Sequence, residues 1–173
     1  MAAAPYAPDD PVDAIMGVMA AAFEPAYGEA WNRRQVSDAL LLGTCRHALI
    51  GADGTVAQEV RDPGGFYLSR GALDEEELLL LAVSPALRGK GLGRVLLDHF
   101  CATAAMRGAE RAFLEMRRGN PAGRLYEANG FQVVGVRPAY YRGSDGARHD
   151  AVSYQKRLRL NSPTFGDGQQ SIL

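Results

Sequence analysis

The chain has 173 residues, a length that suits one domain and buries enough surface to fold without disulfides or metals. Its 19 basic and 20 acidic residues nearly cancel, which argues against a nucleic-acid-binding surface because phosphate backbones select a basic excess. No apolar run reaches the length of a membrane span, and the opening stretch MAAAPYAPDD lacks the basic region and apolar core of a secretory signal. We therefore expect a cytoplasmic domain that binds neither membranes nor nucleic acids.

The spacing of cysteine and histidine residues indicates neither a metal site nor a redox motif. Cys45 and Cys101 belong to no CxxC or Cys/His cluster, so we expect two buried thiols in a reducing compartment, with a disulfide as the less favoured alternative. His47, His99 and His149 have no ligand spacing either, and His99 is expected to be a core or surface residue of a helix. No metal cofactor is therefore expected.

The first part of the chain predicts two helices. Residues 1–11 contain three prolines and are expected to be loose, or at most a short edge strand. Apolar side chains recur on one helical face through residues 12–23, which predicts a helix. After a loop at residues 24–33, a second helix is expected to run from Asn32 to Leu42.

Three strand segments follow these helices. Residues 45–55 predict a strand that enters an Asp-Gly turn at residues 53–54. Residues 56–73 are strand-like but interrupted at residues 61–65, so the sequence leaves their register open. Residues 74–83 end in a strand that is apolar on both faces, which is typical of the middle of a sheet.

The next segments alternate helix and strand. A helix is expected over residues 91–107, closed by a glycine, and residues 111–118 alternate as a strand does. Residues 120–130 predict a short helix, with Asn120 as its N-cap and Pro121 at its first position.

The remaining segments complete a single α/β domain. Residues 131–141 and 149–159 predict two strands joined by a loop that contains an Asp-Gly pair. Residues 161–173 have the composition of a disordered tail. The elements together predict one mixed α/β domain over residues 12–160, built on one sheet.

Glycines stand where the helix at residue 91 should begin, although glycine weakens a helix. Residues 88–93 read Arg-Gly-Lys-Gly-Leu-Gly. A helix N-terminus carries unpaired N–H groups and the positive end of the helix dipole, and glycines let a ligand approach that backbone closely. A strand, a glycine-rich turn and a helix therefore form a cradle for phosphate oxygens, with Arg88 and Lys90 adding charge at its mouth. The alternative is that the glycines form only a turn.

Two common phosphate-binding motifs do not fit this loop. Lys90 is followed by Gly91 rather than by serine or threonine, which rules out GxxxxGK[ST], and GxGxxG lacks its third glycine. Residues 88–93 instead match Arg-Gly-x-Gly-x-Gly, and the chain resembles the GNAT superfamily of N-acetyltransferases, in which this loop holds the pyrophosphate of acetyl-coenzyme A (acetyl-CoA). The resemblance implies the GNAT fold, a mixed and mostly antiparallel sheet flanked by helices, with acetyl-CoA as donor and no metal.

The second half of the chain resembles one branch of that superfamily, RimI, whose members acetylate protein N-termini, notably the N-terminal alanine of a ribosomal protein. The matching segments are Leu114–Arg117, Asn120, Leu125–Glu127, Gly130–Phe131 and Tyr140–Tyr141. The resemblance implies transfer of an acetyl group to a protein α-amino group, with a protein N-terminus as the partner. Residues 31–65 do not follow the branch closely, and the acceptor is selected there.

The resemblance also implies a set of donor-site residues. A backbone N–H before the glycine loop is expected to stabilise the oxyanion, and the Asn120 side chain is expected to contact the pantetheine arm, which is compatible with an N-cap role. The expected cofactor-binding residues are Leu81, Ala82, Val83, Arg88, Gly89, Lys90, Gly91, Leu92, Gly93, Arg94, Asn120 and Tyr126.

Two residues receive catalytic roles from the resemblance. Glu115 is expected to act as general base, directly or through a water, on an amine that must be neutral to attack. Spacing alone favours an edge-strand glutamate paired with Arg117 or Arg118. Tyr126 is expected to protonate the departing thiolate, because a phenol with a pKa near ~10 is protonated at neutral pH. The alternative role of Tyr126 is core packing.

Aromatic residues are expected to form the acceptor site. The resemblance places Tyr140 and Tyr141 in the loop between the last two strands, where similar enzymes hold the peptide backbone; exposed hairpin aromatics are the alternative. Tyr27 and Trp31 lie in the loop between the first two helices and either shape the same site or cap the core. Two other functions stay open: acetylation of a small amine or amino acid, and acyl-CoA sensing without turnover. A monomer or weak dimer is expected.

Overall fold

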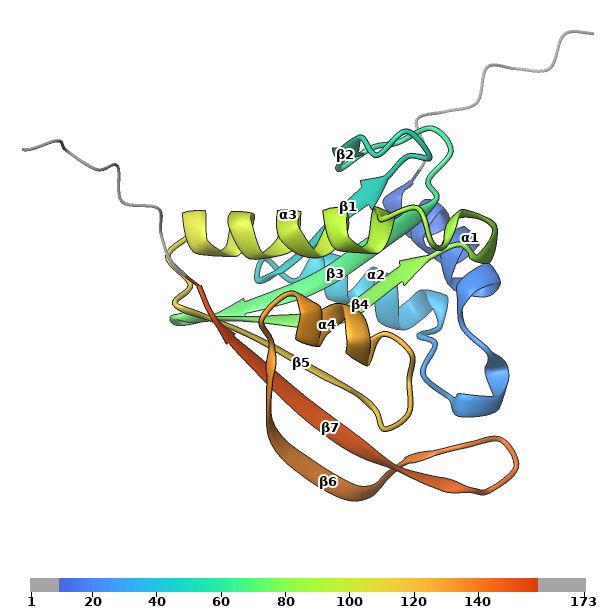
Figure 1. Cartoon of the computed structure of the whole chain (residues 1–173). Coiled ribbons are helices and arrows are strands. Elements are labelled where there is room, and N and C mark those ends of the chain that lie inside the picture. Colours follow the sequence, from blue (N-terminus) through green and yellow to red (C-terminus); the bar gives the residue numbers. More distant parts are fainter. Residues whose placement is uncertain (1–9, 159–173) are drawn as a thin grey trace, which may run out of the picture.

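Helices flank a single seven-stranded sheet in the computed structural model of this chain, which describes residues 10–158 (Figure 1). The elements in chain order are α1 (Pro11–Ala22), η1 (Pro25–Tyr27), α2 (Arg33–Leu41), β1 (Cys45–Ile50), β2 (Val56–Ala57), β3 (Gly65–Ala72), β4 (Glu75–Val83), η2 (Pro85–Leu87), α3 (Leu92–Met106), β5 (Arg111–Arg117), α4 (Gly123–Ala128), β6 (Gln132–Arg142) and β7 (Arg148–Arg157). The strand order is β2-β1-β3-β4-β5-β7-β6, and only the β4–β5 pair is parallel.

Two apolar cores hold the helices on opposite faces of the sheet (Figure 1). α3 and α4 cover one face, where Leu96, Leu97 and Phe100 of α3 are fully buried. α1 and α2 cover the other face through Ile15 and Val36, which are also fully buried. Because full burial of such a side chain is worth about 1.5–3 kcal/mol, these layers fix the helices against the sheet.

β4 and β5 separate after a short paired segment. Their register joins residues 75–78 to residues 111–114 and ends there. Beyond it, β4 stays paired with β3 as far as Val83, whereas β5 stays paired with β7 as far as Arg117. A β-bulge at Leu79 interrupts the β3–β4 register, and such bulges bend a strand. The sheet is therefore forked between β4 and β5.

The three long helices and the mostly antiparallel sheet are confirmed. α1 begins at Pro11 with Asp10 as its N-cap, so residue 11 belongs to the helix rather than to a loose N-terminus. The rest of that segment and the expected tail at residues 161–173 lie outside the described residues.

The start of the short helix α4 differs from the expectation. α4 begins at Gly123, with Ala122 as its N-cap, so Asn120 and Pro121 lie in the preceding turn. Asn120 closes that turn, because its Oδ1 accepts a hydrogen bond from the N–H of Ala122 at 2.9 Å. The asparagine still satisfies a free amide, but from two residues before the N-cap Ala122.

β6 contains Tyr140 and Tyr141, as the strand expected over residues 131–141 predicts, so the loop position also expected for them was wrong. The β6–β7 register is interrupted between Arg137 and Tyr141. Within this interruption Ala139 has a φ of 54°, in the left-handed region that costs a residue with a Cβ about 1–2 kcal/mol. The N–H of Ala139 donates to Oδ1 of Asp150 at 3.0 Å, which holds the distorted segment in place.

The cysteines and histidines form no reactive cluster. Cys101 is buried, and burial raises the pKa of its thiol to about 11, as suits an inert core residue. Cys45 is only partly buried, so the expectation of a second buried thiol is wrong, and both thiols are free. Within residues 10–158 no group of three His, Cys, Asp or Glu side chains could hold a metal. No helix in the same range is long and apolar enough to span a membrane.

Candidate active site

A cleft of about 900 Å³ opens at the fork between β4 and β5. This volume lies within the range of about 300–1,000 Å³ that is typical of small-ligand sites. Of the expected site residues, only Lys90 and Tyr140 do not line the cleft. The expected residues that line it are Tyr27, Trp31, Leu81, Ala82, Val83, Arg88, Gly89, Gly91, Leu92, Gly93, Arg94, Glu115, Asn120, Tyr126 and Tyr141.

The N-terminus of α3 forms one half of the cleft. Gly91 is the N-cap with a φ of 81°, and no side chain caps the helix there. The first N–H groups of α3 therefore keep their hydrogen-bonding capacity for a ligand. Gly89 has a φ of 75°, and a Cβ on either glycine would meet nothing within 4 Å. Open space, free amides and the positive end of the helix dipole together suit phosphate oxygens.

Arg88 supports the loop rather than standing free at its mouth. Its Nε donates to the carbonyl of Val83 at 3.1 Å, and its Nη2 donates to the carbonyl of Ala22 at 2.9 Å. The side chain thus ties the loop to the end of β4 and to the C-terminus of α1. Lys90 is exposed and lies outside the lining of the cleft. Arg88 therefore fixes the geometry of the loop while it keeps a positive charge beside the cleft.

The backbone of β4 forms a wall of the cleft from Leu79 to Val83. The register with β5 ends at Leu78, so the edge of β4 that faces β5 has no strand partner beyond that residue. N–H and C=O groups on such an edge can hydrogen-bond a ligand laid between the strands. The same edge can supply an N–H to an oxyanion, the role that the family resemblance implies for residues 81–83.

Glu115 follows the last residue of β5 that pairs with β4, and its side chain is 18% exposed. Its carboxylate pairs with Nη2 of Arg137 at 3.1 Å and accepts a hydrogen bond from Oγ of Ser153 at 3.0 Å. The interpretation based on spacing, an edge-strand glutamate paired with Arg117 or Arg118, is wrong. β5 lies between β4 and β7, and the partner comes from β6.

Two tyrosines line the cleft, of which Tyr126 is buried and Tyr141 is half-buried. Burial, followed by the charge of Glu29, raises the pKa of Tyr126 above its ordinary value. Burial, followed by the charges of Glu115 and Glu29, raises the pKa of Tyr141 to about 12. Tyr126 also packs edge-on against Phe131, so its expected core role and its place in the cleft coexist. Both phenols can donate a hydrogen bond at neutral pH.

The opposite half of the cleft contains an ion pair that the sequence analysis missed. Oε1 of Glu29 lies 3.5 Å from Nε of Arg117, and the two side chains are only 15% and 10% exposed. The guanidinium of Arg117 lies 3.7 Å from the ring centroid of Tyr27, and Nδ2 of Asn120 lies 3.5 Å from the same glutamate oxygen. Glu29 therefore joins the α1–α2 loop to β5 and puts a second carboxylate in the cleft. The sequence did offer one signal for Glu29, because a charged residue lies between Tyr27 and Trp31 in the loop that was expected to shape the acceptor site.

A family model matches the part of the chain that contains most of the cleft lining. The model for the acetyltransferase (GNAT) domain matches residues 45–133, just over half of the chain. The chain belongs to the GNAT acetyltransferase family. Within this GNAT domain, the matched segment includes the glycine loop, Glu115 and Tyr126, whereas Glu29 and Tyr141 lie outside it. The α1–α2 loop and the end of β6 therefore lie outside the match, although they line the cleft.

The curated relatives of this GNAT domain include two [ribosomal protein bS18]-alanine N-acetyltransferases. The protein of Escherichia coli strain K12 is 40% identical over 88 residues, which cover 50% of this chain and 59% of that protein. The protein of Haemophilus influenzae is 36% identical over 88 residues, which cover 51% of this chain and 60% of that protein. The chain thus spans less than two thirds of the length of these relatives.

A solved structure extends the likeness to the whole fold. The crystal structure of the ribosomal-protein-S18-alanine N-acetyltransferase from Escherichia coli matches with a TM-score of 0.72 at 25% identity. The match covers 88% of this chain and 91% of that one. The expected GNAT fold, a mixed and mostly antiparallel sheet flanked by helices, is confirmed.

Proposed function

We propose that this GNAT protein transfers the acetyl group of acetyl-CoA to the α-amino group at the N-terminus of a protein. The observation that carries the proposal is the meeting of three features in one cleft: the glycine-capped start of α3, the open edge of β4, and Glu115 at the fork. The names of the curated relatives support an N-terminal alanine as the first acceptor to test.

The donor half fits an acyl-CoA. The amides at the start of α3 suit the diphosphate, and the open edge of β4 suits the amides of the pantetheine arm. Asn120 also lines the cleft, and its side chain can contact the pantetheine arm. Bound there, acetyl-CoA supplies an acetyl group activated as a thioester.

The residues of the chain manage two protons during the transfer. The amine nitrogen bonds to the acyl carbon while the carbon–sulfur bond breaks; Glu115 takes the proton that the amine loses, and Tyr126 gives one to the sulfur. Exchange with solvent restores both side chains. An α-amino group has a pKa near ~8 and lysine one near ~10.4, so an N-terminus needs less help from Glu115 at neutral pH.

Replacing Tyr126 by phenylalanine is expected to lower kcat about tenfold with little change in the KM of either substrate. General acids contribute about 10²-fold or more, but a thiol with a pKa near ~8.5 leaves more easily than an alkoxide, so the loss falls below that range. Steady-state release of free thiol measures the effect. An unchanged kcat in the phenylalanine variant would show that Tyr126 is not the proton donor and that it serves only in packing.

A substrate screen tests the proposed function. Peptides that begin with free Ala, Ser or Met, the same peptides with a blocked N-terminus and an internal lysine, polyamines and free amino acids are each incubated with acetyl-CoA. We expect thiol release only with the free N-termini. Turnover of polyamines or amino acids alone would establish the small-amine alternative, and binding of acetyl-CoA without thiol release from any amine would establish a sensor.

A further inference from the structure

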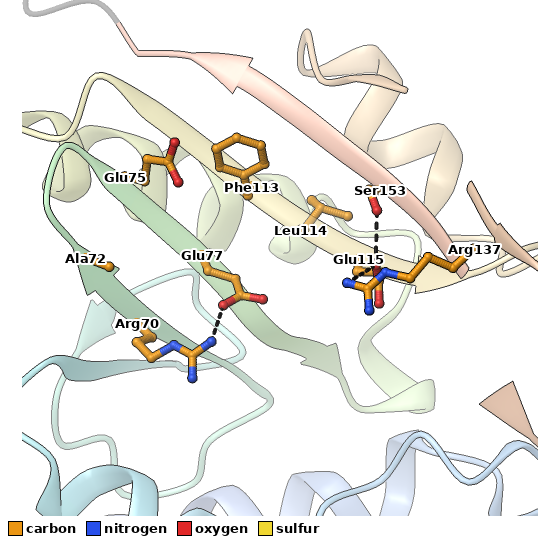
Figure 2. A pocket seen from close by; sticks show the side chains of 9 residues that line it. All are labelled: Arg70, Ala72, Glu75, Glu77, Phe113, Leu114, Glu115, Arg137 and Ser153. Carbon is orange, nitrogen blue, oxygen red and sulfur yellow. Dashed lines mark hydrogen bonds and ion pairs between the residues drawn. The ribbon is translucent and has the colours of Figure 1, made fainter. Parts of the chain in front are cut away.

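The recorded contacts of the Glu115 carboxylate all fall on one oxygen. Oγ of Ser153 donates to Oε2 at 3.0 Å, and Nη2 of Arg137 pairs with the same Oε2 at 3.1 Å (Figure 2). Within residues 10–158 no hydrogen bond or ion pair involves Oε1. The carboxylate is therefore held through one oxygen, which leaves the other for a further partner.

The two holding residues lie outside the main cleft. Glu115 lines both that cleft and a smaller hollow of about 250 Å³, which also includes Glu77 and Phe113. Arg137 and Ser153 line only the smaller hollow (Figure 2). Glu115 thus stands where the two spaces adjoin, and both partners of its carboxylate belong to the smaller hollow.

The strand register fixes the position of Ser153. On neighbouring strands Ser153 stands directly opposite Glu115, and Gly135 of β6 stands opposite Ser153. Directly opposed residues of antiparallel strands have Cβ atoms about 4.5–5.5 Å apart, which is hydrogen-bonding reach for a serine and a glutamate. Gly135 adds no side chain to this row, so Arg137 can reach across it to the carboxylate.

The distortion in β6 fixes the position of Arg137. The guanidinium of Arg137 lies 4.9 Å from the ring centroid of Tyr140. At this distance a cation–π interaction attracts the guanidinium to the face of the ring. Tyr140 follows Ala139, whose positive φ is held by Asp150. The strained segment therefore holds Tyr140 next to Arg137. Strain of this kind gathers at functional sites.

We propose that Arg137 and Ser153 are positioning residues for Glu115. They hold Oε2 on the far side of the carboxylate, so that Oε1 is presented to the acceptor amine or to a water that relays its proton. The inference rests on the proposed function, in which Glu115 is the base. Catalytic bases in other enzymes are likewise oriented by a hydrogen bond from a further residue.

A double-mutant cycle tests the positioning role. Arg137→Gln and Ser153→Ala are made in the wild-type chain and in Glu115→Gln. In the wild-type background each is expected to lower kcat roughly tenfold with the KM of acetyl-CoA unchanged, because misplacing a reacting group by 1 Å can cost about 100-fold. In the Glu115→Gln background neither should cause a further loss, because residues that act through one another are not additive. Arg137→Lys should recover part of the lost kcat.

Arg70→Gln is the matched control for this cycle. Arg70 lines the smaller hollow and pairs with Glu77 at 2.6 Å, and no contact joins it to Glu115. Its replacement should leave kcat unchanged, and thermal unfolding should show that all variants are folded. If each of Arg137→Gln and Ser153→Ala lowered kcat by the same factor in both backgrounds, or did not lower it in the wild-type chain, the positioning role would be wrong. The role of Glu115 as base would still stand. Wild-type turnover in Glu115→Gln would overturn the base assignment and the inference together.

Discussion

Replacing Glu115 by glutamine is expected to lower kcat about 100- to 1000-fold at pH 7, the range of a lost general base. Glutamine keeps the length of the side chain and an oxygen that can accept from Ser153, so the cleft should keep its shape. It cannot take a proton from the acceptor. The KM of acetyl-CoA should change little, because Glu115 stands at the fork and away from the start of α3.

The defect of this variant should depend on pH in one direction. At pH 7 only roughly a tenth of an α-amino group with a pKa near ~8 is neutral, and the fraction rises steeply above that value. A variant without a base depends on that fraction more than the wild-type protein does. The ratio of wild-type to variant kcat should therefore shrink as the pH rises from 7 to 9, as free-thiol release would show.

Glu77→Gln is the control for the loss of a carboxylate. Glu77 stands on β4 in the smaller hollow, half-exposed and paired with Arg70, and it does not line the cleft. Its replacement changes the net charge by the same amount and should leave kcat unchanged. Equal rates for Glu115→Gln and Glu77→Gln at pH 7 would contradict the role given to Glu115.

Replacing Gly91 by valine is expected to weaken the binding of coenzyme A about 100-fold. A β-branched residue at a φ of 81° is strained, and the start of α3 would shift to relieve the strain. The amides would then lose one or two hydrogen bonds to charged phosphate oxygens, each worth about 1.5–3 kcal/mol. Calorimetric titration with coenzyme A measures the change in Kd.

Gly54→Val separates this effect from backbone strain alone. Gly54 has a φ of 86°, and a Cβ there would meet nothing within 4 Å, as at Gly91. It lies in the turn between β1 and β2 and does not line the cleft. The two variants should lose similar thermal stability, but only Gly91→Val should lose affinity. Wild-type affinity in Gly91→Val would show that the glycine loop does not bind the cofactor.

The half of the cleft at α3 could be predicted from the sequence because its determinants are local. A strand, a glycine-rich turn and a helix follow one another within residues 75–106, so spacing alone places their backbone together. Glu115 and Tyr126 were found through family resemblance, and both line the cleft. Arg88 was expected only to add charge at the mouth of the loop; its observed supporting role depends on a contact with Ala22, which no local pattern encodes.

The acceptor half could not be predicted in the same way because distant segments build it. Glu29 meets Arg117 only after the α1–α2 loop folds against β5. Arg137 and Ser153 reach Glu115 through the order and register of three strands, which periodicity does not define. Tyr141 lines the cleft and Tyr140 does not, as expected where successive side chains of a strand point to opposite faces.

A structure of the protein with bound coenzyme A tests the central claim most directly. The account predicts diphosphate oxygens within hydrogen-bonding distance of the amides at the start of α3, and a pantetheine arm along the open edge of β4 that brings the thiol towards Glu115 and Tyr126. Coenzyme A bound at any other place, with the amides that follow Gly91 left to solvent, would contradict it.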